Sequence, residues 1–211
     1  MNQLRPIQTA YNGRLFRSRL EARWAVFFDV CRVRYEYEPE GYRLSNGQLY
    51  LPDFLLHDVT FNHSGCCEGQ DLYVEVKGCM TPEDEQKILC FSGVDRAFAN
   101  GKFHRDVKMT PLYVVGNLPV GNSIKDFEAE VINEGYRWEH KVPFFNFFTV
   151  DGDDFPAMPG VGKDGKFQLF GADSGYFSDM DPDATERAYR AALSARFEHG
   201  ERPSYGRFRY A

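Results

Sequence analysis

The sequence lacks any hydrophobic run long enough to cross a membrane. None of its apolar stretches approaches the roughly 18 to 20 residues that a spanning helix needs, and its first residues have no signal-peptide character. Its five cysteines are odd in number and include no Cys-x-x-Cys pair, the spacing typical of zinc and redox sites. These absences predict a cytoplasmic protein without membrane contact, and they speak against a zinc or redox centre.

Positive net charge is also missing, because the formal charge of the chain is −6, which by itself argues against a nucleic-acid partner. The charges are unevenly distributed, however. Residues 1–34 hold seven arginines and two acids, residues 184–211 hold six arginines and three acids, and residues 151–183 hold eight aspartates and two lysines. Both basic segments could contact phosphates, or their arginines could simply solvate helix faces.

Hydrophobic residues make up 43% of the 211 residues and aromatic residues 16%, which excludes disorder as a description of the whole chain. This length suffices for one sizeable core, or for one domain with an appended segment. We therefore expect a folded protein.

The most informative stretch runs from residue 51 to residue 77. Residues 72–77 read Leu-Tyr-Val-Glu-Val-Lys and alternate with the two-residue period of a strand, so Glu75 and Lys77 share one face about 7 Å apart. Asp53 closes a second short strand, and antiparallel pairing of the two strands would bring its carboxylate beside Glu75. Such a pair would suit a divalent metal ion. The alternative is that these charged side chains are only solvated.

A helix is predicted from residue 18 onward. Its apolar positions recur at the spacing of one helical stripe: Leu20, Trp24, Phe27 and Cys31. Glu21 lies one step off that stripe, at the edge of the core. It could complete a capping box with Ser18 or pair with Arg17 four residues earlier, both structural roles. A role of Glu21 in a catalytic site stays open beside them.

The remaining elements follow from periodicity and from turn signals. Strands are predicted at 35–39, 48–56, 72–76 and 111–116, a polar loop at 57–71, and helices starting at Thr81 and spanning 123–134 and 183–199. The last helix is expected to begin at an Asp183-x-x-Glu186 cap, and residues 143–150 are strongly β-prone. The predicted fold is α/β, with the order αβββαβ, a mixed central sheet and a C-terminal α+β extension.

Pro52-Asp53, then a gap of 22 residues to Glu75-Val76-Lys77, after a helix that carries Glu21, resembles the PD-(D/E)XK nuclease superfamily. The resemblance covers roughly residues 14–116. It implies a restriction-endonuclease-like or resolvase-like core over residues 1–118, with residues 119–211 as an elaboration that packs on the core and ends in a basic helix. The compact chain is similar to small nucleases of bacteriophages or mobile elements, so a bacterial or phage-infected cytoplasm is expected.

The resemblance also implies a chemistry. Asp53, Glu75 and the backbone carbonyl of Val76 would hold one or two Mg²⁺ or Mn²⁺ ions, and Lys77 would orient the attacking water and stabilise charge on the phosphate. Glu21 would join this site. The expected activity is endonucleolytic hydrolysis of DNA.

Contacts to DNA are expected from both basic segments and from the second helix, where some superfamily members place a glutamine or lysine near the substrate. The candidate residues are Arg14, Arg17, Arg19, Gln86, Lys87, Arg190 and Arg196. Gln86 and Lys87 are otherwise ordinary exposed helix positions. Cutting both strands of a duplex with one site per chain would favour a homodimer.

Two other function classes remain open at this point. The first is a catalytically weak or silent member of the same fold that serves as a DNA-binding or assembly module. The second is an inhibitor that mimics DNA with the acidic stretch of residues 151–183. Other nuclease chemistries have little support, because no His-Asn-His or Gly-Ile-Tyr motif is present.

Overall fold

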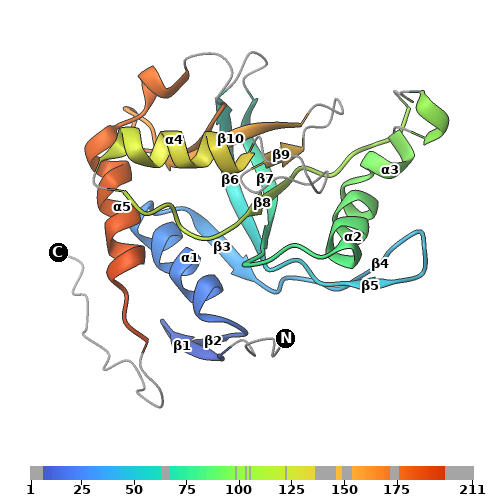
Figure 1. Cartoon of the computed structure of the whole chain (residues 1–211), viewed down its shortest axis with the longest axis horizontal. Helices are drawn as coiled ribbons and strands as arrows, with labels where there is room; N and C mark the ends of the chain where they lie inside the picture. The colour runs from blue at the N-terminus through green and yellow to red at the C-terminus, as the bar shows by residue number, and fades with distance from the viewer. Residues whose placement is uncertain are drawn as a thin grey trace.

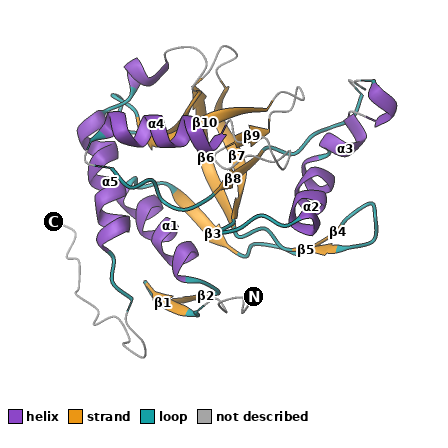
Figure 2. Cartoon of the chain, in the orientation of Figure 1, coloured by secondary structure: helices purple, strands orange, loops and turns teal. Residues whose placement is uncertain are grey.

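One mixed sheet organises the chain (Figures 1 and 2). The computed structural model describes residues 7–62, 67–97, 99–102, 104, 106–121, 123–135, 146–148, 154–171 and 176–197. The strands of the sheet are, in spatial order, β11 (Phe167–Gly171), β10 (Asp154–Val161), β9 (Asn146–Phe148), β8 (Leu112–Val115), β7 (Cys67–Val76), β6 (Phe54–Asn62) and β3 (Arg34–Tyr37). The β7–β8 and β6–β11 pairs are parallel and the other pairs are antiparallel. The chain is therefore a mixed α/β protein.

The sheet curls because β6 pairs with β7 along one edge and with two different strands, β3 and β11, along the other. Its first half pairs with β3 and its last residues pair with β11, which closes the sheet on itself. Asp58, with φ of 59°, lies between the halves, and the register with β7 shifts there. The predicted loop at 57–71 is wrong: most of it is strand. The irregularity at Asp58 moves the buried side chains from even positions to Val59 and Phe61, and this hides the two-residue period.

Two hydrophobic cores cover the two faces of the sheet. Helix α1 (Arg19–Val30) packs beside α5 (Pro182–Ser194) on one face, and α4 (Ile124–Gly135) contacts both α5 and β10 (Figure 1). Fully buried aromatic side chains fill this larger core, among them Trp24, Phe27, Phe28 and Phe54. The start of α1 is as predicted, since the Ser18 side chain accepts a hydrogen bond from the Glu21 amide.

The opposite face carries α2 (Pro82–Ser92) and a hairpin of β4 (Tyr42–Arg43) and β5 (Leu49–Tyr50). A turn that contains Asn46 and Gly47 joins these two strands, and Gly47 has the positive φ that such a turn requires. The start of α2 is also as predicted, with Thr81 as its cap. A crossover through α2 makes β7 and β8 parallel, as expected.

Short elements complete the description. They are β1 (Thr9–Tyr11) paired with β2 (Arg14–Phe16), α3 (Val94–Ala97), and the 3₁₀ turns at Ala99–Gly101 and Tyr176–Asp179. Strands β9, β10 and β11, from the predicted C-terminal elaboration, join the same sheet as β3, β6, β7 and β8. The domain boundary at residue 118 stays a prediction. No helix in the described part of the chain has the length and apolarity to cross a membrane.

The cap of helix α5 lies two residues earlier than the predicted Asp183. Asp181 is the observed cap, its side chain accepting from the Ala184 amide, because Pro182 fits the first helical position. We expect Asp181→Ala to lower the free energy of unfolding in urea by about 1 kcal/mol. Asp183→Ala, the matched control, should cost only about 0.3 kcal/mol through the helix dipole. A larger loss in the Asp183 variant would contradict this assignment.

Candidate active site

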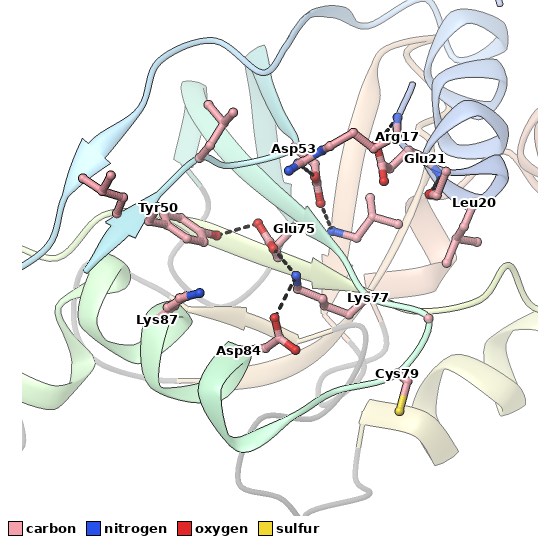
Figure 3. A pocket seen from close by; sticks show the side chains of 15 residues that line it. Arg17, Leu20, Glu21, Tyr50, Asp53, Glu75, Lys77, Cys79, Asp84 and Lys87 are labelled. Atoms are coloured by element: carbon pink, nitrogen blue, oxygen red, sulfur yellow. Dashed lines mark hydrogen bonds and ion pairs between the residues drawn. The ribbon is translucent and has the colours of Figure 1, made fainter. Parts of the chain in front are cut away.

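A cavity of about 770 Å³ lies where the start of α1, the start of β6, the end of β7 and the first turns of α2 meet (Figure 3). Seven of its fifteen lining residues carry ionisable acidic or basic side chains. The acidic lining residues are Glu21, Asp53, Glu75 and Asp84, and the basic ones are Arg17, Lys77 and Lys87.

The two central carboxylates come together through strand register. Phe54 of β6 pairs with Val74 of β7, so Asp53 and Glu75 stand opposite each other one step further along the antiparallel pair. Since side chains alternate between faces, both leave the Phe54 core and point to the α2 side of the sheet. Only 3% of each residue is exposed. The pairing expected from the sequence is therefore present.

Asp53 is held by donors from two directions. Its Oδ2 accepts a hydrogen bond of 2.7 Å from the Val76 amide, and its Oδ1 pairs with the Arg17 guanidinium. Burial raises the pKa of Asp53 well above its ordinary value, and the negative charges of Glu75 and Glu21 raise it further. Burial and the two neighbouring carboxylates thus outweigh the Val76 amide and Arg17, which favour the ionised form of Asp53.

Glu75 is fixed by one donor on each oxygen. The Tyr50 hydroxyl donates to Oε2 at 2.6 Å, and the Lys77 ammonium pairs with Oε1 at 2.8 Å (Figure 3). Lys77 also pairs with Oδ1 of Asp84 at 3.0 Å. Burial by itself lowers the pKa of Lys77, but the two carboxylates outweigh burial, so its pKa is raised and the side chain is charged.

Sequence reasoning missed Tyr50 and Asp84. Asp84 makes two kinds of contact. Its Oδ2 accepts hydrogen bonds from the amide and hydroxyl of the cap residue Thr81, and its Oδ1 pairs with the Lys77 ammonium. The capping box was a usable signal, because it fixes an acid at the start of the helix that follows the Glu75-Val76-Lys77 strand. Nothing local marks Tyr50, which reaches Glu75 only because the β4–β5 hairpin folds under α2.

Glu21 contacts Arg17, as its position suggested, but through the main-chain amide of Arg17. Its Oε2 accepts from the Arg17 amide at 3.1 Å and from the Tyr37 hydroxyl at 2.6 Å, rather than from the amide of the cap residue. The side chain is buried and lines the cavity beside Asp53. It therefore shapes the charge of the cavity while it ties β2, α1 and β3 together.

Of the residues predicted to touch DNA, the structure brings only Arg17 and Lys87 to this cavity. Arg14 lies over the Tyr35 ring, and Gln86 is exposed on α2. Arg190 pairs with Glu186 on α5, Arg196 is exposed just past that helix, and Arg19 is half-buried at the start of α1. A role of any of them in DNA binding stays a prediction.

Comparison of the chain with protein-family models, with curated proteins and with solved structures finds no match. The functional assignment therefore depends on the chemistry of the cavity itself. Its central feature is a pair of buried carboxylates beside a charged lysine.

The donor set fits a hard divalent cation, with one restriction. Within the described residues no group of three or more His, Cys, Asp and Glu side chains is arranged to hold a metal ion. Magnesium, however, is commonly held by one or two carboxylates and keeps several of its waters. Asp53, Glu75 and the main-chain carbonyl of Val76 supply such a set of oxygens. The pKa of Asp53 is raised first by burial and then by the charges of Glu75 and Glu21, and a bound cation would favour its ionised form.

Proposed function

We propose that this protein is a metal-dependent nuclease of the PD-(D/E)XK type that hydrolyses phosphodiester bonds in DNA as an endonuclease. The convergence of Asp53, Glu75 and Lys77 in one cavity is the observation that carries the proposal. The element order supports it as well. Helix α1, strands β3, β6 and β7, helix α2 and strand β8 follow one another in the predicted αβββαβ sequence, with the β4–β5 hairpin inserted.

Each charged group has a role in this chemistry. Asp53, Glu75 and the Val76 carbonyl would hold Mg²⁺ or Mn²⁺, which when bound supplies an activated water at neutral pH. Lys77 donates hydrogen bonds to the phosphate oxygen on which charge develops. Asp84 holds the Lys77 ammonium toward the cavity, and Tyr50 keeps Glu75 in the orientation that presents its oxygens.

The aspartate-rich segment gives less support to a DNA-mimic inhibitor. Asp181 caps α5, and Asp164 accepts hydrogen bonds from the Lys166 amide and the Gln168 side chain. Residues 151–153 and 172–175 lie outside the described residues. Silent DNA binding is disfavoured because both carboxylates and the lysine are present and lie in one cavity.

A plasmid nicking and linearisation assay tests the proposal. The protein is incubated with supercoiled DNA in Mg²⁺, in Mn²⁺ and in EDTA, beside the Glu75→Gln variant, which keeps the shape of the side chain. We expect cutting in either metal and none in EDTA or with the variant. A well-folded protein that leaves supercoiled, single-stranded and branched DNA intact would overturn the nuclease assignment.

Tyr50→Phe tests how the carboxylate is held. Loss of the 2.6 Å hydrogen bond frees the Glu75 carboxylate to rotate, and losing a group that orients a metal ligand typically costs about 10-fold to 100-fold in affinity. We therefore expect a weaker Mn²⁺ titration by calorimetry, with the fold unchanged by circular dichroism. Tyr42→Phe, which removes a hydroxyl outside the carboxylate cavity, is the control and should leave Mn²⁺ affinity unaltered.

A further inference from the structure

A second cavity, of about 300 Å³, opens on the same side of the sheet as the carboxylate cavity. Its lining residues are Tyr42, Arg43, Leu44, Ser45, Tyr73, Cys90, Phe91, Arg96 and Thr110. Two arginines line this cavity and no acid does, whereas four acids line the first cavity. The lining therefore gives this cavity a local positive charge in a chain whose net charge is −6.

The two cavities are neighbours along shared elements. Tyr73 and Glu75 are successive same-face residues of β7, about 7 Å apart. The hairpin runs along both cavities, because Tyr42 of one strand pairs with Tyr50 of the other. Phe91 of α2 stands between them, with its ring 5.1 Å from that of Tyr42 and 4.7 Å from that of Tyr50.

The β4–β5 hairpin has two different faces. Tyr42 and Tyr50 point inward and pack on Phe91, which anchors the hairpin to α2. Arg43 and Leu49 are directly paired and point outward. Leu49 lines the carboxylate cavity although 70% of it is exposed, so it presents apolar surface to whatever enters there.

The side chains of Arg96 and Arg43 are accessible to solvent. The Arg96 side chain is 52% exposed, and its nearest acid in the described chain is Asp95, at 3.9 Å. Its Nη2 lies 3.1 Å from where a Cβ on Gly93 would be, which puts the guanidinium at the C-terminal end of α2. Arg43 has no ion pair among the described residues and is exposed on the hairpin. A guanidinium presents several donors in a plane and matches phosphate geometry.

We propose that this second cavity binds a backbone phosphate of the DNA strand, held by Arg43 and Arg96, next to the segment being cut. The identification of the anion as part of a DNA strand rests on the proposed nuclease function. The strand then passes from the carboxylate cavity over the outward face of the hairpin, with Leu49 against a sugar or base. The Tyr42 and Tyr73 hydroxyls, which are hydrogen-bonded at 2.6 Å, border the phosphate.

DNA affinity measured without metal tests this inference separately from cleavage. Fluorescence anisotropy of labelled single-stranded and duplex DNA in EDTA compares the unaltered protein with the Arg43→Ala/Arg96→Ala double variant. We expect a loss of about tenfold in affinity and a slope of log Kd against log salt that is smaller by about 1. Both arginines are exposed, so the fold should persist, and Arg43→Lys/Arg96→Lys should recover part of the affinity.

A matched control and a competitor define the other outcomes. Lys163→Ala/Lys166→Ala removes two exposed cations from the turn between β10 and β11, which lines neither cavity, and should leave affinity within twofold. Equal affinities for the unaltered protein and the arginine variant would overturn the inference. The inference would also be overturned if inorganic phosphate or a deoxynucleoside monophosphate bound through Arg43 while DNA affinity did not depend on Arg43. Arginine-dependent DNA binding by a protein that cuts nothing would sustain this site and remove the nuclease assignment.

Discussion

Replacing Lys77 with methionine is expected to slow phosphodiester cleavage about 10²-fold to 10³-fold, the cost of removing one donor that stabilises transition-state charge. Methionine keeps much of the length of the side chain and removes its charge. Lys77 is the cation that the Glu75 and Asp84 carboxylates hold in the cavity, at 2.8 and 3.0 Å. Its raised pKa keeps it protonated at neutral pH, as a donor to phosphate must be.

The same variant should separate catalysis from metal binding. Lys77 is not an oxygen donor, and its removal frees Oε1 of Glu75, so Mn²⁺ affinity by calorimetry should be retained or rise. Glu75→Gln should lose both metal affinity and cleavage. Lys166→Met, an exposed lysine of the β10–β11 turn, is the matched control and should cut at the normal rate. Full activity of Lys77→Met in Mg²⁺ would contradict the assigned role.

The arrangement of Asp53, Glu75 and Lys77 was predictable because it depends only on β7 and on the pairing of β7 with β6, the strand before it. The two-residue period of β7 fixes Glu75 and Lys77 on one face, and antiparallel pairing with β6 places Asp53 opposite Glu75. Helix starts were readable for the same reason, since Ser18 and Thr81 satisfy amides only three residues away. These interactions follow from the period of one strand, from the pairing of two consecutive strands and from helix caps, and each of these leaves a pattern in the sequence.

Contacts between residues far apart in the chain could not be predicted from the sequence in that way. The irregularity of β6 at Asp58 changes which positions of the strand are buried. The pairing of β6 with β11 joins residues more than a hundred positions apart in the chain. Arg190 of α5 and Arg196 just beyond it were predicted to touch DNA from charge alone; neither residue lines one of the two cavities, and their role in DNA binding stays a prediction. Tyr50 could not be found either, because its contact with Glu75 depends on how the hairpin meets α2.

Binding of Mn²⁺ should stabilise the folded protein by about 2.7 kcal/mol at a metal concentration 100 times Kd, if unfolded chains bind no metal. The physical reason lies in the buried acids. Asp53 and Glu75 stand opposite each other with 3% exposure, and burial together with repulsion from Glu75 and Glu21 disfavours the ionised form of Asp53. A divalent cation relieves this repulsion only in the folded state. Urea denaturation with and without Mn²⁺ measures the increment.

Asp53→Asn should abolish the Mn²⁺ increment, because an amide is a poor substitute for one of only two carboxylates. The variant keeps an oxygen that can accept from the Val76 amide, so the fold should survive. Asp71→Asn is the matched control: it removes a carboxylate from the neighbouring strand β7, where Asp71 faces His57 and lies outside the cavity, and should leave the increment intact. If Mn²⁺ stabilises the Asp53 variant as much as the unaltered protein, the metal binds elsewhere. The carboxylate pair would then be a structural feature of the sheet, stabilised by Arg17 and the Val76 amide on Asp53 and by Tyr50 and Lys77 on Glu75.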